Sequence, residues 1–218
     1  MQDQLPEQGP RVQALLTAVT DDRQSLLKLG LGEGAFFPLD LMAFGALKRS
    51  ISTASAMVMM VKAWNMVCAR TLLRTHIDTS LRFSSAWLVE KPHDFATNIL
   101  KGERIDRMKS RSGERLTDAY LVATRAPDYP WLPDVYANLS GYIHFSGSHI
   151  TSAVARFGDN RTMEIEISET DLRFPEFSWI EVLECFREAT AMLAHYLDGY
   201  RQTKSMTPEE LAAGRRAG

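Results

Sequence analysis

Helical periodicity over three long segments constrains the fold of this chain most strongly. Apolar residues recur every three to four positions across residues 11–29, 38–90 and 179–203, the spacing that gathers them on one side of an α-helix. Because Asn65 can cap a new helix, the segment 38–90 is predicted to form two consecutive helices. Amphipathic helices of this length bury their apolar faces against one another. The periodicity therefore predicts a mainly α-helical bundle.

The remaining segments predict smaller elements. Two shorter helices are expected at residues 117–124 and 134–145. Beyond them the apolar pattern changes to a period of two on both sides of a Gly-Asp-Asn turn, which is typical of a β-hairpin. We expect a single domain over residues 1–204, with about five to six helices and one β-hairpin at about 153–168, near the C-terminal third. A polar tail follows over residues 205–218.

Composition and charge exclude several classes of protein. The chain has 218 residues, 45% of them hydrophobic, and a formal net charge of −2. These values exclude collagen-like, disordered and disulfide-scaffold chains, and also a generally basic nucleic-acid-binding protein. Cys68 and Cys185 lie far apart, as expected for reduced thiols. The N-terminus lacks a signal-peptide pattern, and the most apolar window, 54–73, is interrupted by polar residues. We therefore expect a cytoplasmic protein with no membrane segment.

Charged residues recur at every fourth position in the helix predicted over residues 66–90. Arg70, Arg74, Asp78 and Arg82 lie on one stripe of this helix, while apolar residues occupy most of its remaining surface. An unpaired charge inside a core costs several kcal/mol. The stripe is therefore expected to meet polar groups from another part of the chain.

A second polar stripe is predicted on the helix at residues 134–145. Tyr136, Ser140 and His144 share one face of that helix, beside an apolar face. Two polar stripes on two core helices indicate either a structural network that sets the helix register or a shared functional site. In the functional interpretation His144 transfers protons and Arg74 binds an anion.

Between residues 101 and 118, six basic side chains alternate with four acidic ones. This pattern predicts either a solvated helix–turn–helix or a patch that contacts phosphate groups. In the second interpretation the cations that contact RNA are Lys101, Arg104, Arg107, Lys109 and Arg111.

The spacing of the histidines predicts neither a metal nor a cofactor. His144 and His149 lie five residues apart, which is not the spacing of a helical zinc pair. A metal site assembled from those two histidines with His76 and Asp78 is an alternative that the spacing favours less than the absence of a metal site. The glycines between residues 30 and 34 follow a helix and not a strand, so they predict a helix stop and not a dinucleotide loop.

Two short segments resemble a known group of proteins. The segment from Arg70 to Asp78, RTLLRTHID, and the segment from Tyr136 to His144, YANLSGYIH, are similar to segments of uncharacterised bacterial helical proteins grouped near the HEPN superfamily. Those proteins have Leu-Arg-x-x-x-acid and, later, Tyr-x-x-Leu-Ser-x-x-x-His. The resemblance covers about residues 44–148.

The resemblance implies a possible chemistry. HEPN ribonucleases are metal-independent dimers in which an arginine, and a histidine four to six positions further on, act on the 2′-hydroxyl and phosphate of RNA. Arg70 and His76 have that spacing. However, six steps along a regular helix place two side chains about 120° apart, and His144 has no arginine upstream at the required distance.

Three functions follow as hypotheses. The first is a non-enzymatic interaction or oligomerisation module, expected as a homodimer in a bacterial stress or phage-defence setting, because buried polar stripes are more often structural than catalytic. The second is a metal-independent ribonuclease with RNA as its partner and a site built from His144, Arg74, Asp78, Ser140 and Tyr136. The third is a small-anion or nucleotide binder at Arg74 and Arg82. No strong sequence feature indicates DNA binding.

Overall fold

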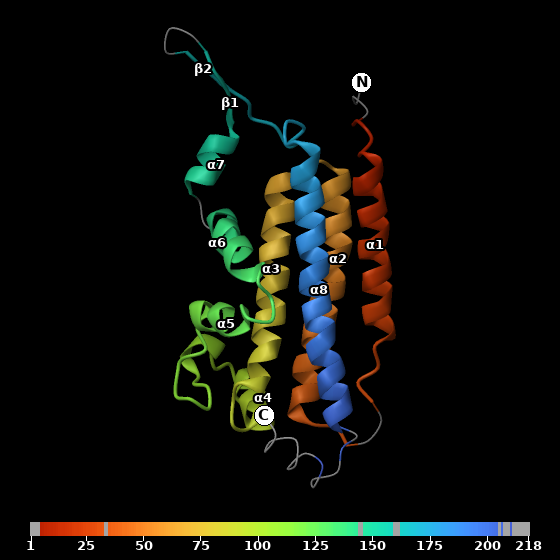
Figure 1. The fold of residues 1–218 in the computed structure, drawn as a ribbon, viewed down its shortest axis with the longest axis vertical. Coiled ribbons are helices and arrows are strands. Elements are labelled where there is room, and N and C mark those ends of the chain that lie inside the picture. Colours follow the sequence, from red (N-terminus) through yellow and green to blue (C-terminus); the bar gives the residue numbers. More distant parts are fainter. Residues whose placement is uncertain are drawn as a thin grey trace.

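A computed structural model describes residues 5–32, 35–143, 146–158 and 162–204, together with residues 206 and 210. The architecture is a helical bundle with one small antiparallel sheet (Figure 1). Its elements in chain order are α1 (Pro10–Lys28), α2 (Pro38–Lys62), α3 (Met66–Ser84), the 3-10 helix η1 (Ser85–Trp87), α4 (Pro92–Leu100), the 3-10 helix η2 (Ile105–Arg107), α5 (Asp118–Arg125), α6 (Leu132–Ile143), α7 (Gly147–Ser152), β1 (Val154–Phe157), β2 (Met163–Ile165) and α8 (Glu176–Lys204).

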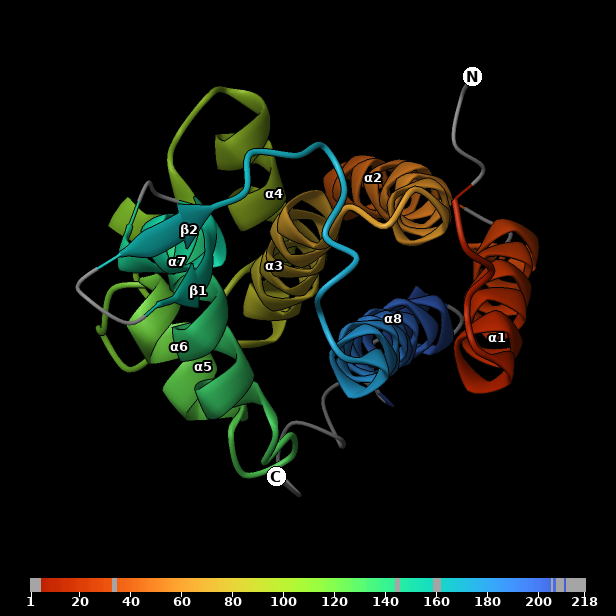
Figure 2. The same cartoon turned by 90° about the horizontal axis from the view of Figure 1, so that it is seen from above.

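The four long helices α1, α2, α3 and α8 form a four-helix bundle (Figure 2). Helices α3 and α8 run parallel, because Trp64, just before α3, packs edge-to-face against Trp179 near the start of α8, at 5.4 Å between ring centroids. Helix α2 is antiparallel to α8, since Asp40 near its start binds Lys204 at the end of α8 at 2.8 Å. A connection between parallel neighbours must return along the whole bundle. Helices α4 to α7 and the hairpin occupy that long crossover.

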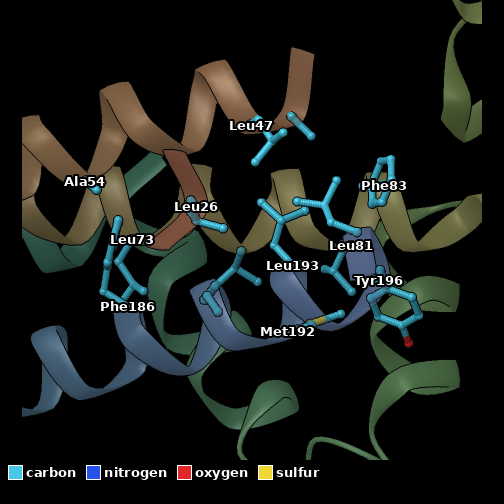
Figure 3. Packing of buried hydrophobic residues seen from close by; sticks show 14 of the residues in the cluster. Leu26, Leu47, Ala54, Leu73, Leu81, Phe83, Phe186, Met192, Leu193 and Tyr196 are labelled. Carbon is cyan, nitrogen blue, oxygen red and sulfur yellow. The ribbon is translucent and has the colours of Figure 1, made fainter. Parts of the chain in front are cut away.

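The core fills the space between the long helices. Leu73 and Leu81 of α3 and Phe186 and Leu193 of α8 point into it (Figure 3). Each of these side chains is at most 2% exposed. Burial of such large apolar side chains contributes on the order of 2 kcal/mol apiece, so the bundle is the stable frame on which the crossover is held.

Helix α3 is shorter than the predicted segment 66–90. It ends at Ser84, and the chain continues through η1 instead. The hydroxyl groups of Ser84 and Ser85 donate to the carbonyl oxygens of Leu81 and Arg82, which competes with the regular helical pattern. Arg125 of α5 also donates to the Ser84 carbonyl oxygen at 2.7 Å. Local serine chemistry and one distant arginine therefore end this helix early.

The expectation of five to six helices is wrong in number, because the described part of the chain holds eight α-helices. The short helices α4 and α7 account for the difference. Both are under ten residues long, too short for periodicity to distinguish from a loop. Two predicted helix starts are confirmed: Asn65 caps α3 by accepting from the Cys68 backbone N–H at 2.9 Å, and Thr117 caps α5.

The predicted β-hairpin is present, although its turn at residues 159–161 lies outside the described residues. Strands β1 and β2 pair antiparallel, with Val154 opposite Ile165 and Phe157 opposite Met163. We call α7, β1, β2 and residues 166–167 the arm; in Figure 1 it stands beside one end of the bundle. Most of the predicted polar tail, residues 205–218, also lies outside the described residues.

No helix in the described ranges has both the length and the apolar character needed to cross a membrane.

Candidate functional site

Helix α3 presents two different faces to its neighbours. One face packs against α8 and buries His76 and Ile77 completely. The other face carries the predicted stripe and lies against the crossover, because Arg74 contacts Tyr136 of α6 and Arg82 contacts Asp118 of α5. The spacing of four residues on α3 therefore places these charged side chains on one side of the helix, where they face the crossover helices α5 and α6.

The stripe meets polar groups of the crossover in what we call the polar cluster: Arg74, Asp78, Arg82, Asp118 and Tyr136. Asp78 lies 3.7 Å from the Arg74 guanidinium and 3.3 Å from that of Arg82. Asp118 lies 3.5 Å from Arg74 and pairs closely with Arg82. The Arg74 guanidinium carbon sits 3.6 Å from the centre of the Tyr136 ring and its N–H donates to the Tyr136 hydroxyl oxygen. The cluster ties α5 and α6 to α3.

The charges within the polar cluster balance, since two arginines face two aspartates. The Arg74 side chain is only 12% exposed, so an incoming anion would have to displace its present partners. Burial raises the pKa of Tyr136 well above its usual range, and its hydrogen bond with Asp118 adds to the increase. Tyr136 therefore stays a neutral phenol, suited to hydrogen bonding and to stacking on Arg74.

The structure brings only some of the predicted site residues together. Arg74, Asp78 and Tyr136 meet in the polar cluster. Ser140 does not join them: it is exposed, and its hydroxyl donates to the Tyr136 carbonyl oxygen at 3.0 Å. His144 lies outside the described residues.

The buried histidine of α3 points away from the polar cluster. The His76 ring stacks on Phe186 at 4.2 Å between centroids, and its Nε2 lies 2.8 Å from the Thr190 hydroxyl. Burial, with a smaller contribution from the nearby charge of Arg49, lowers the pKa of His76 to about 3. Arg70 contacts α6 instead, so Arg70 and His76 lie on different faces, as their spacing along the helix indicates.

The basic segment forms an exposed edge of the crossover. Lys101, Arg104, Arg107, Lys109 and Arg111 are all exposed. Arg104 pairs with Asp106 at 2.6 Å, and Arg111 donates to the Trp87 carbonyl oxygen at 2.5 Å. The two helices of the expected helix–turn–helix are present as α4 and α5. The connection between them is longer than a simple turn, because it contains η2 and a further irregular segment.

A cavity of about 280 Å³ lies at the other end of the stripe, where α3, α6 and α8 meet. Its polar lining residues are Arg70, Asn138, Tyr142, Glu181 and Cys185, and its apolar lining residues are Leu73, Val135, Leu139 and Val182. Arg70 donates to the Tyr142 hydroxyl oxygen. The cavity is therefore lined by both polar and apolar residues.

Sequence reasoning missed several of these residues. Asp118 follows Thr117, so its position predicts only a residue at the start of a helix. In the structure its carboxylate pairs with Arg82 of α3. Asp171 accepts from the Met66 backbone N–H at 2.7 Å and thereby fixes the start of α3. Glu181 and Cys185 reach the cavity from α8, more than a hundred residues from Arg70. No local pattern marks contacts between such distant segments.

Comparison with protein-family models, with curated proteins and with solved structures found no match to this chain.

Proposed function

We propose that this protein is a non-enzymatic interaction module that forms a homodimer through the apolar face of its arm. The observation that carries this proposal is the exposure of that face. Phe157 is 79% exposed, Met163 51%, Ile165 56% and Ile167 94%. Large apolar patches that stay in contact with water mark interaction sites in soluble proteins.

The hairpin separates its side chains into two kinds of surface. Met163, Ile165 and Ile167 alternate with Glu164 and Glu166, so they lie on opposite faces of the strand. Arg156 opposes Glu164 across the hairpin, at 3.5 Å. One face of the hairpin is thus apolar and the other is charged.

An apolar sheet face requires a second layer. A two-stranded hairpin is marginally stable by itself in water, and a sheet with one apolar face is stable when that face is buried. Within the described residues, β1 and β2 have no layer over this face, because each apolar member from Phe157 onward is at least half exposed. Ile143 of α6 and Ile150 of α7 are exposed as well, and we include them in the proposed interface as an extension of the hairpin surface.

A second copy of the chain is the partner that the charge distribution favours. A two-fold interface brings identical patches together. The ionic contacts of the arm, Arg156 with Glu164 and Arg173 with Glu166, are already made within one copy. Two apolar faces can therefore meet without bringing like charges together. Stable interfaces bury about 800 Å² per partner, which requires the extended surface and not the strands alone.

The polar cluster has a supporting role in this proposal. It holds α5 and α6 against α3 through ion pairs and through the stack of Arg74 on Tyr136. Because α6 leads directly toward the arm, the cluster fixes the base from which the arm projects. Anion binding at Arg74 and Arg82 is not carried forward, since both guanidinium groups already have carboxylate partners.

The oligomeric state tests the proposal. We expect the wild-type chain to elute as a dimer by size-exclusion chromatography with light scattering, and Ile165→Asp to elute as a monomer. Met59→Asp is the matched control, because Met59 is also exposed, at 64%, but lies on α2. This control should remain dimeric. A wild-type monomer at the highest attainable concentration, or equal effects of the two substitutions, would contradict the proposal.

Metal-independent RNA cleavage is the second candidate function. The exposure of the five basic residues from Lys101 to Arg111 favours it. Incubating the wild type and His144→Ala with a mixed RNA pool in the presence of a chelator tests it. Cleavage that depends on His144 would make the ribonuclease the primary function. If the wild type cleaves no RNA, the ribonuclease function is excluded and the interaction module is retained.

A further inference from the structure

The cavity between α3, α6 and α8 has one cationic lining residue, Arg70. Arg70 forms no ion pair within the described residues, unlike Arg74 and Arg82 in the polar cluster. Its guanidinium instead stacks on Tyr142 at 4.8 Å and on Phe174 at 5.0 Å from the ring centres. One Arg70 N–H donates to the Tyr142 hydroxyl oxygen, and aromatic stacking leaves the remaining edge N–H groups available for planar, paired hydrogen bonds. A carboxylate is the group that matches this geometry best.

The same cavity also contains an anion. Glu181 reaches it from the first turns of α8 and forms no ion pair within the described residues. Its neighbour Glu184, one turn further along α8, pairs with Arg11 at 2.7 Å outside the cavity. One positive and one negative side chain thus line the same cavity.

The rest of the lining is apolar, through Leu73, Val135, Leu139 and Val182. The volume of about 280 Å³ lies just below the roughly 300–1,000 Å³ of sites for drug-sized ligands. The cavity therefore suits a ligand smaller than a drug-sized molecule, with a short apolar group and charges of both signs.

We propose that this cavity binds a small zwitterion, an α-amino acid with an apolar side chain. Arg70 receives the carboxylate, Glu181 receives the ammonium group, and the four aliphatic residues surround the side chain. This binding site is independent of the dimer interface proposed for the arm, and its test does not depend on the oligomeric state.

Cys185 provides a direct readout, because its half-buried thiol lines the cavity whereas Cys68 is exposed on α3. Burial and the neighbouring carboxylates of Glu181, Glu184 and Glu188 raise the pKa of Cys185 to about 11, so alkylation of this thiol is slow. A ligand in the cavity should slow it further and leave Cys68 unaffected. Peptide mass spectrometry after maleimide treatment measures both rates in one sample.

The probe is L-leucine, followed by the other apolar amino acids, in titration calorimetry and in the alkylation assay. Two analogues dissect the recognition: 4-methylpentanoate lacks the ammonium group and 3-methylbutylamine lacks the carboxylate. We expect L-leucine to bind and to protect Cys185, and each analogue to bind at least about tenfold more weakly, as expected from loss of a charged hydrogen bond.

Three substitutions complete the test. Arg70→Met and Glu181→Gln should each weaken binding at least about tenfold, and Glu184→Gln should leave it unchanged. Protection is compared within each variant as the ratio of Cys185 alkylation rates without and with ligand, because the substitutions themselves alter the charge near the thiol. Glu181 is exposed, so its variant tests the site even if Arg70→Met folds poorly. Absence of binding by every apolar amino acid, or equal affinity for 4-methylpentanoate and L-leucine, would overturn the proposal.

Discussion

In the four-helix bundle, apolar side chains such as Ile77 and Leu193 are completely buried, whereas in the arm Phe157 and Ile167 are 79% and 94% exposed. Both regions are amphipathic in sequence, the bundle with a helical period and the arm with a strand period. The bundle contains four long helices that cover one another, while the hairpin has only two short strands. The contrast shows that an amphipathic pattern identifies an apolar face without identifying what covers it.

The largest difference is expected between matched truncations in the two regions. Leu193→Ala should lower the free energy of unfolding by about 2–5 kcal/mol, because it removes buried methyl groups from a packed core. Ile167→Ala should change it by less than about 0.5 kcal/mol when measured by urea denaturation in dilute, monomeric protein. Similar losses for the two variants would mean that the arm is packed within the monomer.

The second expected effect is a pH dependence that arises in the bundle. The unfolded chain binds a proton at His76 near pH 6.5, while the folded pKa is about 3. A lowered folded pKa stabilises the protein above pH 6.5, and this stabilisation is lost as the pH falls from 6.5 toward 3. The slope from one proton is at most about 1.4 kcal/mol per pH unit.

Urea denaturation from pH 7 to pH 4.5 measures that slope. His76→Gln should flatten it, because glutamine does not titrate. His195→Gln is the control, since His195 lies exposed on α8, and it should retain the wild-type slope. An unchanged slope in His76→Gln would show that another group controls the acid sensitivity.

A smaller effect is expected at the junction between the two regions. Tyr136→Phe keeps the ring on which Arg74 stacks and removes the hydroxyl to which Arg74 donates. We expect a loss of about 1 kcal/mol in unfolding free energy. The exposed Ser140 on the same helix is the comparison, and Ser140→Ala should be close to neutral. Equal losses for the two variants would argue against the polar cluster as the attachment of α6.

The smallest effect is expected on the charged face of the arm. Glu164→Gln breaks an ion pair with Arg156 in which both side chains are more than half exposed, and such pairs contribute little. The variant should have the wild-type melting temperature and the wild-type oligomeric state in light scattering. Dissociation of a dimer by this change would place the charged face, and not the apolar face, at the interface.

Regular elements could be predicted wherever the pattern was long. The segments 11–29 and 179–203 correspond to α1 and α8 within three residues at each end. The end of α3 could not be predicted in full, because it depends in part on Arg125, which reaches Ser84 from a position forty-one residues further along the chain. Helix α7 has only six residues, and no periodic signal survives at that length.

The candidate site was predicted in the same uneven way. The fourfold spacing of Arg70, Arg74, Asp78 and Arg82 is a local property, and so the stripe could be placed on one side of a helix. Its partners could not be assigned in full: Tyr136 was expected and is present, Asp118 was not expected, and Ser140 faces solvent. Sharing a helical face with Tyr136 was not enough, because the Ser140 hydroxyl donates to the Tyr136 carbonyl oxygen within α6 and does not reach α3.

The sequence by itself determined which helices are long, where their apolar faces lie and that the hairpin has one apolar side, because each depends on spacing between near neighbours. Only the tertiary structure decided that α3 and α8 run parallel, that Asp118 pairs with Arg82, and that Arg70 and Glu181 line one cavity. Those outcomes depend on how the long crossover returns along the bundle. A contact between residues a hundred positions apart is set by packing, for which the local pattern carries no signal.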